Sequence, residues 1–510
     1  MQNNYFSGNV SGSETTDTID KNSNSIFSLD DKLKTYFPEM VVFKDLKKIN
    51  IFSNLGLPSF LRDWLLKQFQ NDSGKFDSQQ LATFVNKYLP KKEDWLSIKN
   101  RITVEHERVQ ILTKITVDIN ISTREVTFSL PNYGLTNKET IIEPEVWFEV
   151  KDDLVAGNEI WGILELGYRP PIDEPHYKQR GKIKLTNFKS FRPYDVDTNY
   201  YKEARKMFST SEWINILLGA IDYNASGYKD EHEKLAVLTR LLPFIEKRLN
   251  LIELAPKGTG KSYMFGHISK FGLLTDGGKV TRAKMFYDTS KRQMGFIAGH
   301  DYVAIDEVKL VTFGDINEMR SIMQGYMEYG TFNIGGFNGE SDAGIVFLGN
   351  IDKDNMNVYT NMFTELPSLF KESALVDRIH GFIKGWDIPR MNDDLKVCGW
   401  ALNSEYFCTM IHILRSDVSY RAIVDEILDV PYGSDTRDTE AVKRICTAYL
   451  KLLFPNVCSV EDVNLREFNR YCLSPAKKMR GIIIKQLGIL DPGDFEGKNI
   501  PDIKIKKDLQ

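Results

Sequence analysis

One octapeptide, Ala255-Pro-Lys-Gly-Thr-Gly-Lys-Ser262, constrains the fold of this chain more than any other stretch. The apolar run before it, residues 249–254, is typical of a short buried strand, and residues 263–270 carry apolar side chains at helical spacing. A glycine loop between a strand and a helix is the context that a phosphate-binding loop requires. We therefore expect a nucleotide to bind at Ala255, Pro256, Lys257, Gly258, Thr259, Gly260, Lys261 and Ser262.

The residue types of this loop explain why an anion would bind to it. Gly258 and Gly260 allow the backbone to turn its N–H groups inward around phosphate oxygens, and the following helix directs its positive end to the same place. Lys261 adds a charge for the β- and γ-phosphates, and the Ser262 hydroxyl is a ligand for Mg²⁺. The loop departs from the usual G-x-x-x-x-G-K-[ST] pattern at Ala255, which does not tolerate a positive φ. A chance match on a Gly/Lys turn is the alternative interpretation.

Residues 301–307, Asp-Tyr-Val-Ala-Ile-Asp-Glu, read as an apolar strand that ends in two acids. This is the Walker B arrangement, in which Asp306 holds Mg²⁺ and its water and Glu307 orients and polarises the attacking water. A strand that ends in a charged turn by chance is the alternative, and the phosphate loop upstream disfavours it. The second acid fits ATP hydrolysis better than nucleotide binding alone.

Polar residues farther along the chain complete the expected site. Asn350 ends another apolar strand, residues 344–350, and fits the sensor 1 position of AAA+ ATPases. Arg378 follows a helical stretch and is a candidate arginine finger, a group worth ~10³–10⁵ in rate when it reaches a neighbouring subunit's nucleotide. Arg437, in the first turn of a helix, is a sensor 2 candidate, with Arg444 as the second choice. Each arginine has the alternative of an ordinary surface residue.

The rest of the chain predicts a second domain before the ATPase core. Helical patterns begin at Ser28, and then alternating residues 111–121 and 125–130 predict an antiparallel hairpin around residues 122–124. Further strands are expected at 146–150, 160–168 and 181–188. The expected organisation is a disordered tail (1–27), an N-terminal α+β domain with room for a DNA-binding barrel (28–197), an AAA+ α/β core (198–392), a helical lid (393–490) and a charged tail (491–510).

Composition limits the classes of partner. The 510 residues carry a net charge of −4, which argues against a chain coated with positive charge for nucleic acid but does not exclude a local basic groove. No apolar run approaches the ~18 residues of a membrane span, and no signal pattern opens the chain. We therefore expect a cytoplasmic protein with no membrane partner.

Beyond the nucleotide motifs, several stretches in the same order resemble the BrxL family, the Lon-like AAA+ proteins of BREX phage-defence systems. The resembling segments are 29–33, 37–38, 44–46, 208–214, 250–262, 301–308, 349–351, 377–380 and Gly385-Trp-Asp-Ile-Pro389. The resemblance implies an α/β AAA+ P-loop ATPase core with a C-terminal helical lid and an N-terminal α+β domain, related to the MCM helicases. It also implies ATP and Mg²⁺ as cofactors. The implied partners are duplex DNA, other BREX components and further copies of the chain in a ring, expected to be hexameric.

Two features bear on what such a ring would grip. A strand–turn–strand pattern, residues 327–348, occupies the place of the MCM pore hairpin, and its tip offers Phe337 and Asn338 instead of basic residues. Phe337 would either stack on a base or pack within the hairpin. In the alternative function, a protein-remodelling unfoldase, Phe337 or Tyr326 would grip polypeptide. A third possible function is a scaffold in which ATP hydrolysis serves only as a switch for assembly.

Two further expectations follow from the N-terminal and C-terminal regions. Arg101, Arg108, Lys114 and Arg124 are candidate DNA-channel residues, each with solvation as the alternative. The chain ends about fifty residues after the helix expected to finish before Pro455, which leaves no room for a Lon-like protease domain, so peptidase activity is not expected.

Overall fold

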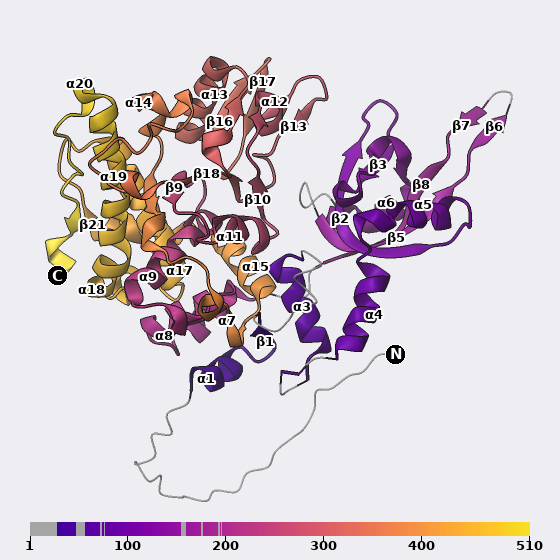
Figure 1. Cartoon of the computed structure of the whole chain (residues 1–510), viewed down its shortest axis with the longest axis horizontal. Coiled ribbons are helices and arrows are strands. Elements are labelled where there is room, and N and C mark those ends of the chain that lie inside the picture. The colour runs from indigo at the N-terminus through magenta and orange to yellow at the C-terminus, as the bar shows by residue number, and fades with distance from the viewer. Residues whose placement is uncertain are drawn as a thin grey trace, which may run out of the picture.

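The structure, a computed structural model, describes residues 28–46, 57–71, 74–75, 77–154, 160–174, 177–191, 194 and 196–509. The predicted disordered tail, residues 1–27, lies outside this described part. Two bodies are visible, an α/β body and a barrel, with helices α3 (Ser59–Phe69) and α4 (Ser78–Tyr88) between them (Figure 1). In the described part, no helix combines the length and apolar character needed to cross a membrane.

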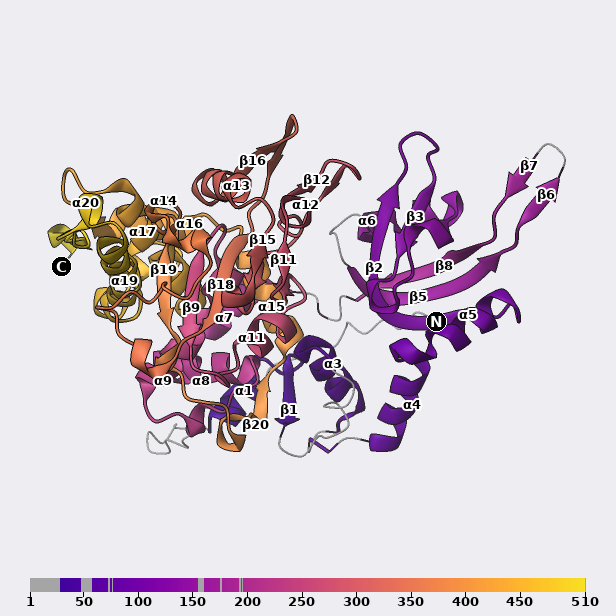
Figure 2. The ribbon, with the colours of Figure 1, turned by 45° about the horizontal axis from the view of Figure 1, so that its top comes forward.

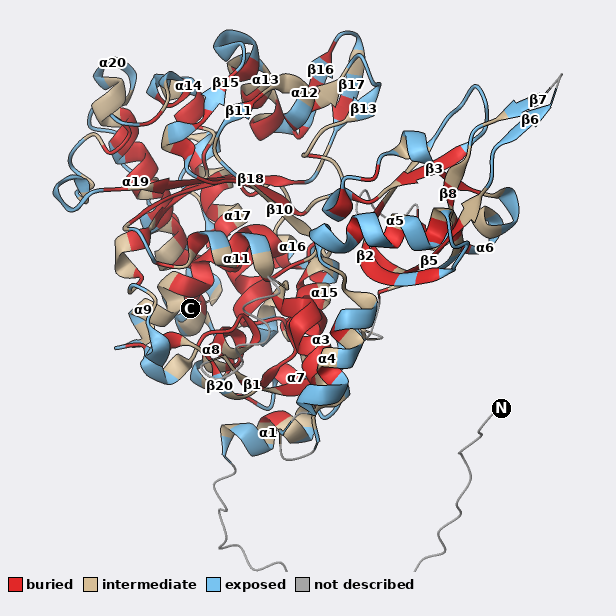
Figure 3. Cartoon of the chain, turned by 45° about the vertical axis from the view of Figure 1, so that its right-hand side comes forward, coloured by how far each residue is buried: buried red, intermediate tan, exposed pale blue. Residues whose placement is uncertain are grey.

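A parallel five-stranded sheet forms the centre of the α/β body. Its strand order is β10-β14-β18-β9-β19, with every neighbouring pair parallel. The strands are β9 (Leu251–Ala255), β10 (Gly272–Thr275), β14 (Tyr302–Ile305), β18 (Gly344–Asn350) and β19 (Gly381–Lys384). Most of their residues are buried, as strands covered on both faces require (Figure 3). Since β18 lies between β9 and β14, the ends of these three strands meet at one edge.

Helices and small strand pairs cover this sheet. Residues 198–245 form α7 (Thr198–Arg205), α8 (Thr210–Ala220), α9 (Glu231–Leu238) and α10 (Leu242–Ile245). A 3-10 turn (Thr239–Leu241) separates α9 from α10, and Pro243 stands in the first turn of α10, where its missing N–H costs nothing. Around the sheet lie α11 (Lys261–His267), α12 (Arg282–Met285), α13 (Ile316–Tyr329), α14 (Ser373–Val376), β11 (Lys279–Val280), β12 (Tyr287–Asp288), β13 (Gln293–Met294) and β15 (Thr312–Phe313).

The N-terminal region contains a closed barrel with strand order β2-β3-β4-β8-β5. Its strands are β2 (Val109–Ile119), β3 (Val126–Ser129), β4 (Thr140–Ile142), β5 (Ile160–Arg169) and β8 (Lys182–Ser190), and β6 (Ile172–Glu174) pairs with β7 (Tyr177–Gln179) in a projecting hairpin (Figure 2). The predicted hairpin is confirmed, with Ile119 opposite Val126. Helix α5 (Trp95–Thr103) packs on β2 and β5.

The strand expected at residues 146–150 is wrong, because this segment belongs to helix α6 (Pro144–Leu154). Pro144 opens the helix, and the buried residues Val150 and Leu154 stand four positions apart on one face. The spacing of the apolar side chains is therefore helical, and the high content of β-branched and aromatic residues was the misleading signal.

The first elements of the chain pack on the α/β body, although they were expected within a separate N-terminal domain. Strand β1 (Val41–Asp45) pairs antiparallel with β20 (Cys398–Leu402), with Val41 opposite Leu402. In α1 (Leu29–Tyr36), Leu33 is buried in the same apolar cluster as Leu217 of α8. The 28–197 unit stays a prediction: Leu33 and Val41 pack into the α/β body, whereas Val42 packs with α3, α4 and the barrel residues Leu112 and Trp161.

The C-terminal region is helical. It consists of α15 (Ser404–Leu414), α16 (Ser419–Ile427), α17 (Thr436–Leu453), α18 (Leu465–Phe468), α19 (Ser474–Leu490) and α20 (Pro492–Phe495). Residues 491–509, the described part of the segment expected as a charged tail, are packed against these helices: β22 (Lys504–Ile505) pairs with β21 (Leu428–Asp429), and Ile503 and Ile505 are buried. The alternation of isoleucine and lysine over residues 503–506 is the local signal for this strand.

Candidate nucleotide-binding site

The predicted phosphate loop joins the end of β9 to the start of α11. Gly258 and Gly260 have φ values of +82° and +80°, the left-handed region that glycine enters without strain. Ala255 ends β9 without a positive φ, so its difference from the usual glycine needs no change in the backbone. The Cβ of Ala255 fits beside Gly385 because that residue has no side chain. A Cβ built on Gly385 would lie 2.1 Å from the Ala255 Cβ.

The side chains expected around the phosphates are brought together at the ends of β9, β14 and β18. Ser262 Oγ donates a hydrogen bond to Asp306 Oδ2 over 2.5 Å. Lys261 Nζ donates to Asn350 Oδ1 over 2.9 Å, and Asn350 Nδ2 donates to both carboxylate oxygens of Glu307 over 3.1 and 3.2 Å. A connected set of hydrogen bonds therefore runs from the loop lysine through Asn350 to the second acid.

Glu307 has an unusual backbone conformation. Its φ of 47° and ψ of 44° place it in the left-handed region, and its N–H donates to Asp306 Oδ1 over 2.8 Å. A non-glycine residue in this region costs of order 1–3 kcal/mol and persists where the surroundings hold it. This backbone turn points the two adjacent carboxylates to different partners, Asp306 to Ser262 and Glu307 to Asn350.

Burial and neighbouring charges set the electrostatics of the loop lysine. Burial lowers the pKa of the Lys261 ammonium below its ordinary value. The carboxylate of Glu253 opposes this shift, while the guanidinium of Arg240 adds to it. The lysine thus lies in a partly dry site where an added anion would be strongly attracted.

A buried ion pair between Arg240 and Glu253 supports the phosphate loop from the protein interior. It was not predicted from the sequence. Arg240 and Glu253 are both fully buried, with Arg240 Nη2 2.6 Å from Glu253 Oε1 and Arg240 Nε 2.9 Å from Glu253 Oε2. Arg240 Nη1 also donates to the carbonyl oxygen of Thr259 over 2.8 Å. The signal in the sequence was Glu253 itself, because a carboxylate inside an apolar strand needs a buried partner.

The segment after β19 holds the outer side of the loop. Met391 N donates to Gly258 O over 2.8 Å, and Arg390 Nε donates to Lys257 O over 3.0 Å. Both donors follow the Gly-Trp-Asp-Ile-Pro stretch at 385–389. This stretch therefore places two donors on carbonyl groups of the phosphate loop.

The residue after Ser262 belongs to a second buried network. Tyr263 Oη and Ser59 Oγ both donate to Asp222 Oδ2, over 2.7 and 2.6 Å. Arg62 and Lys44 lie 2.6 and 3.1 Å from Asp222 Oδ1. Although burial alone would raise the pKa of the Asp222 carboxyl, these two cations hold it well below its usual range.

The three predicted arginines form a separate cluster. Arg378 Nε and Arg437 Nε lie 3.0 and 3.1 Å from the same oxygen of Glu328, Oε2, and Arg437 Nη1 lies 3.0 Å from Asp377. Arg444 donates to Glu440 and to the carbonyl of Lys247. All three line one cavity of about 280 Å³. Across the described residues, none of their hydrogen bonds or ion pairs reaches the phosphate loop, Asp306, Glu307 or Asn350.

The residues present fit a magnesium nucleotide. The Ser262 hydroxyl and the Asp306 carboxylate already share a hydrogen bond, and Mg²⁺ commonly takes one or two protein oxygens and fills its other positions with phosphate oxygens and water. No cluster of three or more His, Cys, Asp or Glu side chains in the described part is arranged to hold a metal by itself. The cation would therefore bind together with the phosphates.

Two family models match the chain. The model described as "Lon-like protease BrxL-like, ATPase domain" matches residues 183–501, and the model described as "BREX system Lon protease-like protein BrxL N-terminal" matches residues 35–168. The first match alone covers more than half of the 510 residues. The chain belongs to the BrxL family.

Curated BrxL proteins resemble it over most of its length. The Lon-like protease BrxL of Escherichia coli O9:H4 (strain HS) is 28% identical over 478 residues, which is 92% of this chain and 66% of the relative. The Lon-like protease BrxL of Bacillus cereus (strain H3081.97) is 28% identical over 456 residues, 88% of this chain and 66% of the relative. The chain thus spans just under two thirds of the length of these BrxL relatives.

Membership in the BrxL family confirms the resemblance noted in the sequence. It identifies the α/β body as an AAA+-like ATPase core of a BREX-system protein. An ATPase domain also implies nucleotide binding, with Mg²⁺ as the usual companion.

Proposed function

We propose that this BrxL-family chain is a ring-forming AAA+ ATPase that couples Mg-ATP hydrolysis to binding or translocation of duplex DNA in anti-phage defence. The observation that carries the proposal is the division of the predicted site into two clusters. Lys261, Ser262, Asp306, Glu307 and Asn350 form one cluster at the sheet edge. The other is the arginine cluster around Glu328.

The residues at the sheet edge have separate tasks. The N–H groups around Gly258 and Gly260 and the Lys261 ammonium bind the phosphates, and Ser262 and Asp306 hold the cation. Mg-ATP, when bound, supplies the phosphoanhydride to be cleaved and a cation that neutralises its charge. Glu307 orients and polarises the attacking water, and Asn350 positions both the Glu307 carboxylate and the Lys261 ammonium.

Arg378 and Arg437 act on the nucleotide of a neighbouring subunit. Both guanidinium groups rest on Glu328, so they lie on the same face of the molecule. A phosphoryl group in transfer is stabilised by nearby positive charge. Within the described part of one chain, the arginine cluster does not reach the phosphate loop, so it cannot supply this charge to the chain's own nucleotide. The second subunit therefore completes the site. A closed ring, for which we propose six copies, gives every subunit one complete site.

The barrel is the proposed DNA-contacting part. Two of its candidate basic residues are already paired, Arg101 with Glu107 over 2.7 Å and Arg108 with Glu165 over 3.3 Å. Arg124 is exposed in the β2–β3 turn, where its φ is 58°. We therefore assign a DNA-contacting role first to Arg124, and the other BREX components remain proposed partners.

The pore hairpin is formed by β16 (Thr331–Ile334) and β17 (Phe337–Glu340), joined by Gly335 and Gly336. The expected first strand began earlier, at 327, but residues 327–329 end helix α13. Phe337 stacks on Tyr287 with ring centroids 3.9 Å apart, which favours packing over base stacking. Tyr326 is buried, and its hydroxyl donates to Ala343 O over 2.7 Å, so it is not a gripping residue.

Steady-state ATPase rates test the proposal. The rate would be measured alone, with duplex DNA and with an unfolded protein, using Glu307→Gln as the inactive control. We expect stimulation by DNA that fades as salt rises, because phosphate contacts release counterions. Stimulation by the unfolded protein alone would support an unfoldase. A Glu307-dependent rate that neither addition changes would support a nucleotide-switched scaffold.

A further inference from the structure

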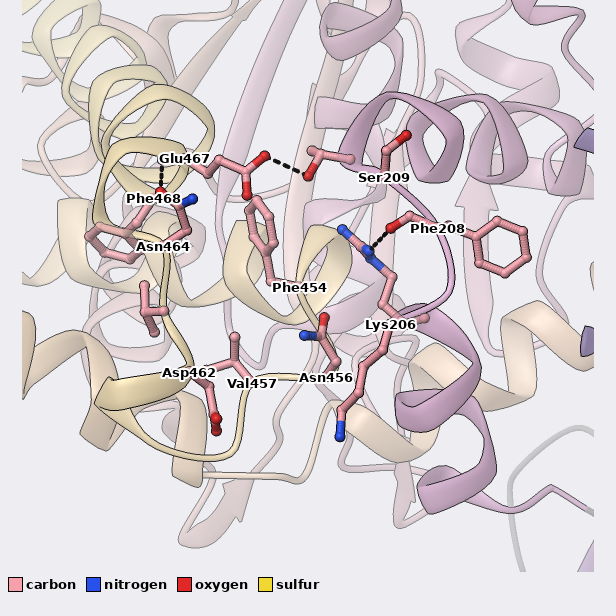
Figure 4. A pocket seen from close by; sticks show the side chains of 13 residues that line it. Lys206, Phe208, Ser209, Phe454, Asn456, Val457, Asp462, Asn464, Glu467 and Phe468 are labelled. Carbon is pink, nitrogen blue, oxygen red and sulfur yellow. Dashed lines mark hydrogen bonds between the residues drawn. The ribbon is translucent and has the colours of Figure 1, made fainter. Parts of the chain in front are cut away.

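A cavity of about 350 Å³ lies on the helical side of the α/β body. It opens between the turn that joins α7 to α8 and the residues that follow α17 and lead into α18. Figure 4 shows Phe454, Asn456 and Lys206 around it. No residue of the proposed ATPase site lines it. Its volume is at the lower end of the range for small-ligand pockets, ~300–1,000 Å³.

The wall of this cavity contains a buried cation without an acidic partner. Arg205 is 5% exposed, and its guanidinium donates from Nε to Leu453 O over 2.9 Å and from Nη1 to Phe208 O over 2.7 Å. Within the described part of the chain, no carboxylate oxygen lies within 4 Å of it and no acceptor for Nη2 is found. Glu467 is the acid whose charge acts on Arg205, but its carboxylate accepts a hydrogen bond from Thr210 Oγ1 over 2.7 Å instead.

Among the described residues, the Arg205 guanidinium is held by two carbonyl oxygens and has no ion pair with a carboxylate. Burial lowers the pKa of Arg205 to about 10, and Glu467 only partly opposes the shift. Buried cations in proteins are normally paired with an anion, since an isolated buried charge is costly. The rings of Trp213 and Phe454, 5.3 and 5.7 Å from the guanidinium carbon, flank the group but carry no charge.

A second polar atom in the same cavity also lacks a partner. Asn456 Oδ1 is buried and, among the described residues, accepts no hydrogen bond. A buried acceptor left unpaired costs of order 1–3 kcal/mol. Phe454, Val457 and Phe468 contribute apolar surface to the lining. Two acids also line the cavity, and both accept hydrogen bonds from the chain: Asp462 from the backbone N–H groups of Cys458 and Ser459, and Glu467 from Thr210.

We propose that this cavity binds the C-terminal end of a polypeptide that finishes in an apolar residue. The terminal carboxylate accepts from Arg205, the amide N–H beside it donates to Asn456 Oδ1, and the apolar side chain contacts Phe454, Val457 and Phe468. A free N-acylated apolar amino acid offers the same three groups. Carboxylate capture of this kind is a recurrent mode of peptide recognition.

The rim of the cavity offers a variant that tests the pocket without disturbing its buried wall. Lys206 is exposed and pairs with Glu203 over 2.6 Å. Lys206→Glu places a carboxylate at the mouth, where it repels an incoming anion and competes for Arg205. Lys478→Glu makes the same charge change at an exposed position outside the cavity and is the matched control.

Titration calorimetry would use N-acetyl-leucine, N-acetyl-leucinamide, a tetrapeptide ending in leucine as free acid and as amide, and inorganic phosphate. We expect saturable binding of the two acids, at least about tenfold weaker binding of the amides and about tenfold weaker acid binding by Lys206→Glu. Lys478→Glu should bind like the natural chain. A tetrapeptide acid about tenfold tighter than N-acetyl-leucine would identify a polypeptide end, and equal affinities would identify a small acid as the ligand.

Three results would overturn the assignment. They are no saturable binding of either acid, equal affinity of acid and amide, and binding of phosphate in place of the acids. The same titrations with Glu307→Gln should give unchanged acid affinity, because the cavity is separate from the nucleotide site.

Discussion

Tyr263 and Asp222 are joined by a hydrogen bond of 2.7 Å that connects the phosphate loop to the N-terminal helices. Tyr263 directly follows Ser262, whose hydroxyl is 2.5 Å from Asp306, while Asp222 also accepts from Arg62 and Ser59 of α3. A displacement at Ser262, the proposed cation ligand, would therefore reach α3 through Tyr263 and the Asp222 carboxylate. We infer that nucleotide binding and the position of α3 are coupled.

Tyr263→Phe removes this connection while keeping the ring. A buried hydrogen bond to a charged group contributes about 1.5–3 kcal/mol, so the variant should be less stable by about that amount. The measurement is the thermal unfolding midpoint with and without Mg-ADP, where we also expect a smaller nucleotide-induced increase. Tyr432→Phe, at a fully exposed tyrosine, is the control and should leave both quantities unchanged.

Arg240 is predicted to position the phosphate loop in addition to stabilising the fold. Arg240→Met should destabilise the chain by about 3–5 kcal/mol, because it leaves Glu253 buried and unpaired. The double variant Arg240→Met/Glu253→Leu should recover most of that stability but bind ATP about tenfold more weakly, since Thr259 O loses its donor. Normal ATP affinity in the refolded double variant would show that the pair has only a structural role.

The parts that could be predicted from sequence are those with local patterns. The strands β9, β14 and β18 are apolar runs, interrupted in β9 by Glu253, and they end in loop or polar residues, so Lys261, Asp306 and Asn350 could be placed at one sheet edge. The side-chain geometry supports that placement.

The parts that could not be predicted depend on residues distant in sequence. The pairing of β1 with β20 has no local signature, and a charged residue such as Asp222 or Arg62 looks the same in sequence whether it is solvated or buried. The strand prediction for residues 146–150 failed for a different reason. The apolar side chains have helical spacing, but the prediction gave more weight to the β-branched and aromatic composition.

Mixing two inactive variants tests whether Arg378 serves a neighbouring subunit. Lys261→Ala and Arg378→Ala should each hydrolyse ATP poorly, but a mixture should regain activity, because about one interface in four joins an intact loop to an intact arginine. A mixture of Lys261→Ala with Asp306→Asn should regain none, since both changes lie in the same half of the site. Equal results from the two mixtures would place Arg378 outside the nucleotide site.

His380 predicts a dependence of stability on pH. Burial, together with Arg444 and Arg480, lowers the pKa of His380 well below its ordinary value, and its Nδ1 accepts a hydrogen bond from Asn250 N over 2.9 Å. Below about pH 6.5 the unfolded chain binds a proton at this histidine that the folded chain does not, so stability falls by up to about 1.4 kcal/mol per pH unit.

His380→Asn keeps an acceptor near the Nδ1 position and removes the titration. The unfolding midpoints of both proteins would be compared at pH 7.5 and 5.5, and the variant should lose less stability between them. Parallel losses in the two proteins would mean that His380 is protonated in the folded chain.

The attachment of the barrel limits how it can move. On one side, α3 packs against α15 and β1 of the α/β body, and on the other side Tyr201 and Ala204 of α7 are buried in that body's core. The barrel is thus a looped-out insertion anchored at both ends. An object held at two points turns most freely about the line that joins them, so we expect the barrel to rotate mainly about the line through α3 and α7.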